Sequence, residues 1–426
     1  GEEGQPQQVD GVYQISTGGE LKWFAGLVNG ALENVDQNAA ASAVLTADIS
    51  LSDFIWMPIG SKDTPFAGSF DGQGHAISGL YIDAQGDYQA LFGYASADAV
   101  IAHFSVSGSV EANGSYVAGI LAAGEASMND LHNSCSVVAT GGYVGGVAGY
   151  ISAKTARIES CTNSGSIYTS AETGEYKGGY IGGVVGRCDG TVENCANSGM
   201  VSGYQDVGGV AGYTHRPSNC KNTADVFAIS KEVGGVFGRS SGAKNCVNYG
   251  TVTASGVFKN NRYSSESIGG VIGYGSGANL TNYGKVQYSA SGNVVTNWVG
   301  GIVGRFTGNV SDCANYGDVS ACGSFVGGIG SGERNYTAKV TRCVNHGSVI
   351  NDTVNAIGTG GVASYATVDQ CYNTGDVRGF DGVGGVLGIS QNLLSKLVGG
   401  ASASYNLGRV VGNNYVGGVA GGASAA

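Results

Sequence analysis

Residues Val233 to Val252 read V-G-G-V-F-G-R-S-S-G-A-K-N-C-V-N-Y-G-T-V, and this stretch decides the fold. Its two halves, V-G-G-V-x-G and C-x-N-x-G-x-V, return with changes along most of the chain. The first half starts again at Val144, Val207, Val383 and Val416. A phrase that returns every 20–50 residues indicates a solenoid, in which each copy stacks on the next.

The second glycine of the phrase marks each copy of the repeat. The marked positions are Ala90, Gly119, Gly146, Gly183, Gly209, Gly235, Gly270, Gly301, Gly328, Gly361, Gly385 and Gly418. The shortest copies, of roughly 25 residues, have room for three strands of about 4–5 residues and three turns, but not for a βαβ unit of about 30 residues. The sequence therefore predicts an all-β, right-handed parallel β-helix with three-strand coils and about twelve repeats.

The chain before the repeats predicts a different organisation. Residues 1–9 are polar and are expected to be a disordered linker or a tag remnant. Residues 10–87 are expected to form an N-terminal cap and the first irregular coils, and residues 88–426 the repeats. Thr17 and Glu20 have the spacing of a capping box, and the apolar pattern after them predicts a helix from Gly18 to about Asn29. Such a helix would cover the exposed end of the solenoid.

The repeats contain a column of cysteines that alternates with Leu and Phe in other copies, which indicates an inward-facing apolar position. We expect reduced thiols there, because side chains in register on parallel strands point the same way rather than at each other. The assigned members are Cys135, Cys161, Cys195, Cys220, Cys246, Cys313, Cys343 and Cys371.

Two further columns follow the cysteines. An asparagine lies two positions after the cysteine, and its amide is expected to hydrogen-bond to the next coil. The members are Asn163, Asn197, Asn222, Asn248, Asn282, Asn315, Asn345, Asn373 and Asn406. A glycine lies two positions later still, and we expect it to take a positive φ in a turn. Its members are Gly165, Gly199, Gly250, Gly284, Gly317, Gly347, Gly375 and Gly408.

Composition narrows the classes of function. The net charge is −11, and the 21 Lys and Arg residues form no basic stripe, which argues against nucleic acid and anionic membranes as partners. No apolar run reaches the roughly 20 residues of a membrane span. The chain lacks C-x-x-C and H-E-x-x-H motifs and a dense Asp cluster. We expect no metal, no cofactor and no enzymatic activity, and a monomer in solution.

The phrases G-G-V-x-G and C-x-N-x-G-x-V together resemble the GLUG repeat of bacterial cell-surface proteins. The block with W56-M-P-I-G60 and F70-D-G-Q-G74 looks like the region that leads into such repeats. The resemblance covers about residues 10–421. It implies an extracellular protein, either secreted or anchored to the outer membrane, with a lipid on the unprocessed N-terminus as one route. Such repeats are known from adhesins of gut bacteria and as non-catalytic parts of proteins named immunoglobulin A-specific metallopeptidases.

Two consecutive copies carry long insertions, between Gly250 and Gly269 and between Gly284 and Gly300, and insertions often build a binding face. Aromatic rings beside amides suit sugar rings and their hydroxyls. The predicted ligand-binding residues are Phe258, Asn260, Asn261, Arg262, Tyr263, Tyr288, Asn297 and Trp298. The structural alternative is that Trp298 belongs to an aromatic column with Tyr143, Tyr180, Phe325 and Tyr415.

Three functions remain open at this point. The leading hypothesis is an adhesin-like, non-catalytic surface protein that binds host or dietary glycans or glycoproteins through the inserted loops. The second is a β-helix polysaccharide lyase or glycoside hydrolase, with candidate groups Asp312, Asp318, Asp369, Asp376, Arg342 and Arg378. The third is a non-catalytic stalk of an immunoglobulin A peptidase. Exposed loop aromatics would favour the first, and carboxylates beside Arg or Lys in a groove would favour the second.

Overall fold

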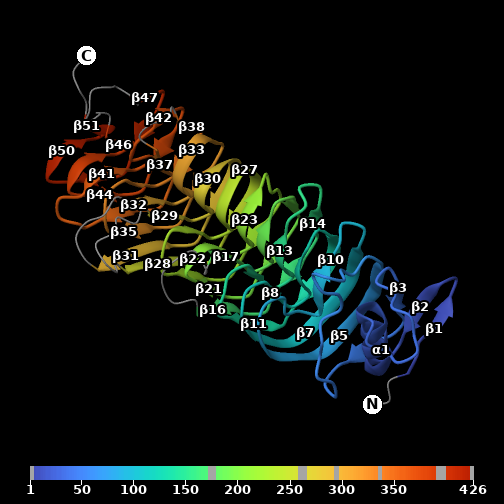
Figure 1. Cartoon of the computed structure of the whole chain (residues 1–426). Helices are drawn as coiled ribbons and strands as arrows, with labels where there is room; N and C mark the ends of the chain where they lie inside the picture. The colour runs from blue at the N-terminus through green and yellow to red at the C-terminus, as the bar shows by residue number, and fades with distance from the viewer. Residues whose placement is uncertain are drawn as a thin grey trace. The chain divides into compact units, whose positions relative to one another are not determined.

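The computed structural model describes residues 4–170, 179–257, 266–291, 297–333, 338–389 and 400–422. They divide into two compact units, and Figure 1 shows the labelled strands along the chain. Unit 1 comprises Gly1–Tyr204 and Val210–His215, and unit 2 comprises Gln205–Gly209 and Arg216–Ala426. Each unit is a right-handed parallel β-helix, which confirms the predicted fold class, and the chain contains about 12 turns.

Helix α1 (Gly18–Asn29) lies within unit 1 where the sequence predicts it. The Thr17 hydroxyl accepts from the Glu20 backbone N–H, the Glu20 carboxylate accepts from the Thr17 N–H, and Gly30 ends the helix at φ 67°. The buried Phe24 ring lies 6.2 Å from the ring of Phe70, so the helix packs on the first coils. No helix in the described ranges has the length and apolarity of a membrane span.

The expected linker at residues 1–9 is partly ordered. Gln7–Val9 forms strand β1, which pairs antiparallel with β2 (Val12–Ile15). The pairing with β2 holds residues 7–9 in a regular strand despite their polar composition. The assignment of residues 7–9 to a disordered linker is therefore wrong.

The other strand pairs of unit 1 are parallel. They form ladders in which each strand hydrogen-bonds to its equivalent in the next coil. The strands are β3 (Ser42–Leu45), β4 (Ile49–Ser50), β5 (Ser69–Gln85), β6 (Phe92–Ala95), β7 (Val100–Asn113), β8 (Val117–Ala118), β9 (Leu121–Gly124), β10 (Ser127–Asn133), β11 (Ser136–Ala139), β12 (Val144–Gly145), β13 (Ala148–Ile151), β14 (Arg157–Glu159), β15 (Thr162–Asn163), β16 (Ile167–Thr169), β17 (Gly179–Gly182), β18 (Val185–Cys188), β19 (Thr191–Glu193), β20 (Ala196–Asn197), β21 (Val201–Gly203) and β23 (Ala211–His215).

Unit 2 repeats the same ladders. One ladder carries the Gly-Gly phrase: β22 (Gln205–Gly208), β26 (Glu232–Gly234), β29 (Glu266–Gly269), β32 (Asn297–Gly300), β36 (Val326–Gly327), β41 (Ile357–Gly360), β45 (Asp381–Gly384) and β50 (Asn414–Gly417). A second follows the turn glycine: β25 (Val226–Ala228), β28 (Val252–Val257), β31 (Val286–Ser291), β35 (Val319–Ala321), β40 (Val349–Asn351), β44 (Val377–Arg378) and β49 (Val410–Val411).

The remaining strands of unit 2 carry the segment from the Val-x-Gly half to the Cys-x-Asn half. They are β24 (Lys221–Asn222), β27 (Phe237–Asn248), β30 (Ile272–Asn282), β33 (Val303–Ser311), β34 (Ala314–Asn315), β37 (Gly330–Gly332), β38 (Lys339–Thr341), β39 (Val344–Asn345), β42 (Thr367–Asp369), β43 (Tyr372–Asn373), β46 (Leu387–Ile389), β47 (Gly400–Ser402), β48 (Tyr405–Asn406) and β51 (Ala420–Gly422). Their inward Val, Ile and Cys side chains fill the core.

The predicted asparagine ladder is confirmed within each unit. In unit 2 every Nδ2 from Asn222 to Asn373 donates to the Oδ1 of the next coil's asparagine at 2.7–2.9 Å. The second N–H of each amide donates to the carbonyl oxygen two residues later. In unit 1 the ladder starts one copy earlier than expected, at Asn133. These buried amides are thus satisfied by their own column.

The turn glycines have a different role from the predicted one. None of the eight has a positive φ. The glycine is required by contact instead: a Cβ on Gly284 would overlap the carbonyl oxygen of Gly250 in the preceding coil. The positive φ angles fall on other residues, among them the residue before the cysteine column, such as Asn245 and Asn279.

The cysteine column is buried and its thiols are free, as expected, but one member was misassigned. His132 pairs with Thr162, so Leu131 lies opposite Cys161. Cys135 instead takes the place of the turn glycine, and its carbonyl oxygen faces Gly165. Burial raises the pKa of the Cys135 thiol to about 12, so this thiol is poorly nucleophilic.

Candidate functional site

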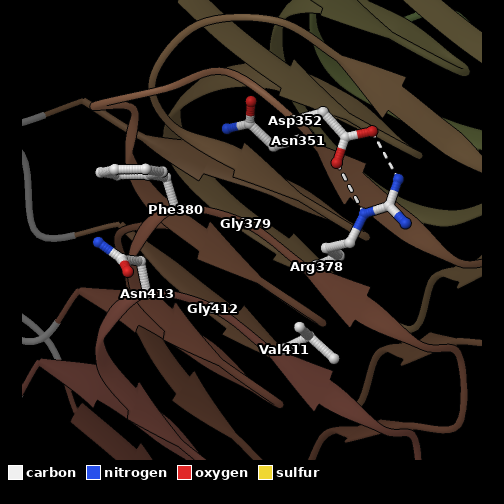
Figure 2. Close-up of a pocket in the computed structure, with 8 residues that line it drawn as sticks. All are labelled: Asn351, Asp352, Arg378, Gly379, Phe380, Val411, Gly412 and Asn413. Atoms are coloured by element: carbon white, nitrogen blue, oxygen red, sulfur yellow. Dashed lines mark hydrogen bonds and ion pairs between the residues drawn. The ribbon is translucent and has the colours of Figure 1, made fainter.

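An open cavity of about 260 Å³ lies at one corner of unit 2, where three consecutive coils turn towards the Gly-Gly ladder (Figure 2). Three strands lead into it: β40, β44 and β49, in which Val349, Val377 and Val410 are register partners. The lining residues are Asn351, Asp352, Arg378, Gly379, Phe380, Val411, Gly412 and Asn413.

The register of the parallel strands brings these residues together. Val377 is buried, so by the two-residue period of a strand the next residue, Arg378, points outward. The backbone of the corner is fixed by two hydrogen bonds: Gly379 N–H donates to Val411 O at 3.0 Å, and Asn413 N–H donates to Phe380 O at 2.7 Å. The cavity wall is therefore main-chain structure rather than a free loop.

Glycines form the middle of the cavity. A Cβ on Gly379 would lie 2.6 Å from Thr359 Oγ1, and a Cβ on Gly412 would lie 2.6 Å from a Val383 methyl group. Figure 2 shows both glycines between Arg378 and Val411 on one side and Phe380 and Asn413 on the other. The chain packs too closely at these two positions to admit a side chain. With none there, the space between the flanking side chains stays open.

One side of the cavity carries a bidentate ion pair between Arg378 and Asp352. Arg378 Nε donates to Asp352 Oδ1 at 2.7 Å, and Nη2 donates to Oδ2 at 2.5 Å. These hydrogen bonds raise the pKa of the Arg378 guanidinium. Both side chains are about half exposed, so the pair adds little stability. Its bidentate geometry instead holds a donor and an acceptor group in fixed positions for a ligand.

Asn351 borders the cavity from the core side. It is 1% exposed, and its Nδ2 donates to Gly323 O at 2.8 Å and to Thr359 Oγ1 at 3.2 Å. Like Val349 two residues earlier, its side chain faces inward. Asn351 therefore supports the cavity wall and does not offer its amide to a ligand.

The other side of the cavity carries Phe380 and Asn413. Phe380 is half-buried, Asn413 is exposed, and the ring of Phe380 makes no ring contact with the described residues. Another aromatic row of unit 2 differs: Tyr249, Tyr283 and Tyr316 stack at 4.9 Å, so their faces cover one another. The part of the Phe380 ring that lines the cavity, beside the Asn413 amide, suits the apolar face and the hydroxyls of a sugar ring.

The structure describes only three of the eight predicted ligand-binding residues. Phe258, Asn260, Asn261, Arg262 and Tyr263 lie outside the described residues. Tyr288, Asn297 and Trp298 are 4%, 1% and 7% exposed, so the expectation that they form an exposed patch is wrong.

Packing in the aromatic column explains the burial of Trp298. Its ring stacks at 5.9 Å on Phe325, and Arg305 lies 4.3 Å from its centroid. This is the structural alternative that the sequence also allowed. Tyr288 is enclosed near Gly256, where its hydroxyl would lie 2.6 Å from an added Cβ.

Carboxylates beside arginine do occur in unit 2, as the enzyme hypothesis requires. One such pair, Asp352 and Arg378, lies in the open cavity, and another group is enclosed. Arg239 Nε lies 2.6 Å from Asp206, and its Nη2 lies 3.1 Å from Glu232. The carboxylates are 4% and 11% exposed. Burial, and then the charge of Glu232, raise the pKa of Asp206 to about 7. Of the predicted groups, Arg342 pairs with Asp312 on an exposed face.

Comparison with known proteins finds one similar solved structure and no family. No protein-family model matches the chain, and no curated protein matches it. The chain is similar to a crystal structure from Bacteroides ovatus described as that of a "putative immunoglobulin A1 protease". The identity is 16%, the TM-score is 0.37, and the match covers 84% of this chain and 83% of the other. Likeness at this level carries no argument about function, and the GLUG resemblance stays a likeness of motifs.

Proposed function

We propose that this protein is a non-catalytic, adhesin-like protein of the cell exterior that binds a glycan or glycoprotein through the cavity at Arg378 and Phe380. The observation that supports it most is an open cavity in which the Phe380 ring lies across from the bidentate Asp352–Arg378 pair. An apolar surface with a few convergent polar groups is the usual character of a ligand site.

The size and charge of the cavity narrow the ligand class. A cavity of about 260 Å³ is at the lower end of ligand pockets and suits one sugar residue rather than a long chain. Asp352 and Arg378 neutralise each other, so no net charge selects an ionic ligand. Asp352, Arg378 and Asn413 offer acceptors and donors to hydroxyls. A terminal neutral sugar is the ligand that this set fits best.

The experiment is a glycan-array screen of the whole protein beside three variants. Phe380→Ala and Asn413→Ala alter the cavity, and Tyr283→Ala removes an exposed ring elsewhere on unit 2. We expect Phe380→Ala to weaken binding about tenfold or more, and Tyr283→Ala to bind like the parent. Circular dichroism checks that each variant is folded. Equal loss in Phe380→Ala and Tyr283→Ala would place the site elsewhere.

The parent protein and the same variants also distinguish the two alternatives, a polysaccharide-degrading enzyme and a non-catalytic stalk. Incubation of a bound glycan with the protein, followed by mass spectrometry, detects cleavage products, and their appearance would favour the lyase or hydrolase. Absence of binding by every variant and by the parent would favour the stalk of an immunoglobulin A peptidase. The location outside the cell is tested separately, by labelling intact cells with an antibody to the protein.

A further inference from the structure

Unit 1 holds a built-in cation between tyrosine rings. The guanidinium carbon of Arg187, on β18, lies 5.4 Å from the ring centroid of Tyr150, 5.1 Å from that of Tyr180 and 4.8 Å from that of Tyr213. Tyr150 and Tyr213 are its register partners in the preceding and following coils. Arg187 Nε donates to Asp189 at 2.8 Å. This cation is therefore sandwiched by rings two coils apart and neutralised by a carboxylate two residues later.

Two coils earlier the same arrangement recurs without its cation. Ala123, on β9, occupies the position of Arg187, and its register partners are Tyr94 and Tyr150. Glu125 follows Ala123 by two residues, as Asp189 follows Arg187. The flanking rings and the carboxylate are thus present, while the side chain that would lie between them is a methyl group.

The rings around Ala123 are held in place by contacts of their own. The Tyr150 hydroxyl donates to Asp189 Oδ2 at 2.9 Å, and Tyr94 packs edge-on against Tyr88 with centroids 6.0 Å apart. Ala123 itself is buried and both flanking rings are half-buried. The methyl group of Ala123 is thus covered by its neighbours, and only the outer parts of the two rings reach solvent.

The electrostatics around this position favour a cation. After burial, the charge of Glu125 is the next cause that raises the pKa of Tyr94, and Asp87 raises that of Tyr88. Lys62 acts on Tyr94 in the opposite direction and is the weakest of the causes. One difference from the Arg187 position is that Tyr116 stacks between Tyr88 and Tyr143 at 4.7 and 4.8 Å, so it offers an edge rather than a face.

We propose that unit 1 binds a guanidinium group, as on an arginine side chain of a partner protein, between the rings of Tyr94 and Tyr150 beside Glu125. Arg187 shows which cation this arrangement accepts, since a planar guanidinium already lies between the equivalent rings. A cation over aromatic rings gains a modest attraction that grows when water is excluded. The site is independent of the cavity in unit 2.

The test is an NMR titration of the whole protein with carbon-13-labelled tyrosine rings. The probe is N-acetyl-arginine amide, and urea is the control because it is planar and similar in size but neutral. We expect saturable shifts of the Tyr94 and Tyr150 signals with the arginine probe and none with urea at equal concentration. Signals are assigned from Tyr94→Phe and Tyr150→Phe, which keep the rings.

Three variants decide the assignment. Ala123→Arg places a cation in the position and should abolish binding while all rings remain. Tyr94→Leu should weaken binding about fivefold. Arg187→Ala should create a second site, seen as new shifts at Tyr213. Shifts with urea, or unchanged binding by a folded Ala123→Arg protein, would overturn the proposal.

Two further probes test the chemistry and its source. Tetramethylammonium binding ten times more tightly than the arginine probe would overturn the choice of guanidinium. Agmatine carries the same guanidinium on a small free amine. If agmatine binds ten times more tightly than the arginine probe, the site is assigned to a small molecule rather than a protein side chain. If agmatine binds equally or more weakly than the arginine probe, the result supports a protein partner.

Discussion

Asn345 Nδ2 donates a hydrogen bond of 2.7 Å to Asn373 Oδ1, and both amides are completely buried. Asn345 Oδ1 in turn accepts from Asn315, so each amide joins three coils. The ladder is a polar column inside an otherwise apolar core, and each member depends on its neighbours for its hydrogen bonds.

Replacement of Asn345 by Ala should therefore be costly. The change leaves Asn315 Nδ2 without one acceptor and Gly347 O without its donor, so we expect a loss of about 3 kcal/mol in the free energy of unfolding. Urea denaturation of the whole protein measures it. Asn414→Ala is the control, because Asn414 is exposed and donates once, to Asp381. A similar loss of unfolding free energy in both variants would show that burial of the ladder does not contribute to stability.

Gly284→Ala should destabilise unit 2 by about 3 kcal/mol, because the added methyl group would overlap Gly250 O and force the coils apart. The measurement is the thermal unfolding midpoint. Gly418→Ala is the matched change, since an added Cβ there meets no atom within 4 Å. A normal midpoint for Gly284→Ala would mean that the coils separate easily.

Asp206 should make the stability of unit 2 depend on pH. Its folded-state pKa, raised to about 7, lies above the ordinary value of 3.8, so the folded state binds this proton more tightly than the unfolded state. Stability contributed by the protonated group is therefore lost as pH rises from about 4 to about 7. Denaturation of the parent and of Asp206→Asn across this range should show a steeper fall for the parent. Parallel curves would contradict the assignment.

The two arginine–carboxylate sites should respond differently to loss of the arginine. Arg239→Ala leaves two enclosed carboxylates without their shared partner and should cost about 3 kcal/mol or more at pH 8. Arg378→Ala removes an exposed pair and should leave the unfolding midpoint unchanged while weakening glycan binding. A large loss of stability in Arg378→Ala would show that its ion pair is structural.

The sequence predicted the architecture well because each repeated column has one physical cause. The asparagines are recognisable because every coil needs the same buried amide, and the capping box at Thr17 is a local signal. Asn133 was missed because Cys135 was taken as the column member of its copy, which puts the expected asparagine position at Val137. The same copy misled the cysteine assignment, since Cys135 lies near the expected spacing but four residues after Leu131.

Most of the candidate site was not predicted, because its residues belong to three copies. Arg378 was named, but as a candidate group of the enzyme hypothesis. Asn351, Phe380 and Asn413 become neighbours only through the register of β40, β44 and β49. The sequence alone did not single out these positions among the other differences between copies. The length of the inserted copies led to the prediction of a binding face there. Their described aromatic residues, Tyr288 and Trp298, are instead buried within the coils.

The asparagine ladder also gives the stack a direction. In both units each amide donates towards the coil that comes later in the chain. When a coil has folded and the next one has not, its asparagine carries a waiting N–H donor at the growing face. The next copy supplies the acceptor, and with it the glycine that permits close approach. A stack that folded in the order of synthesis would therefore present one N–H donor at its growing face, which the asparagine of the next coil would satisfy.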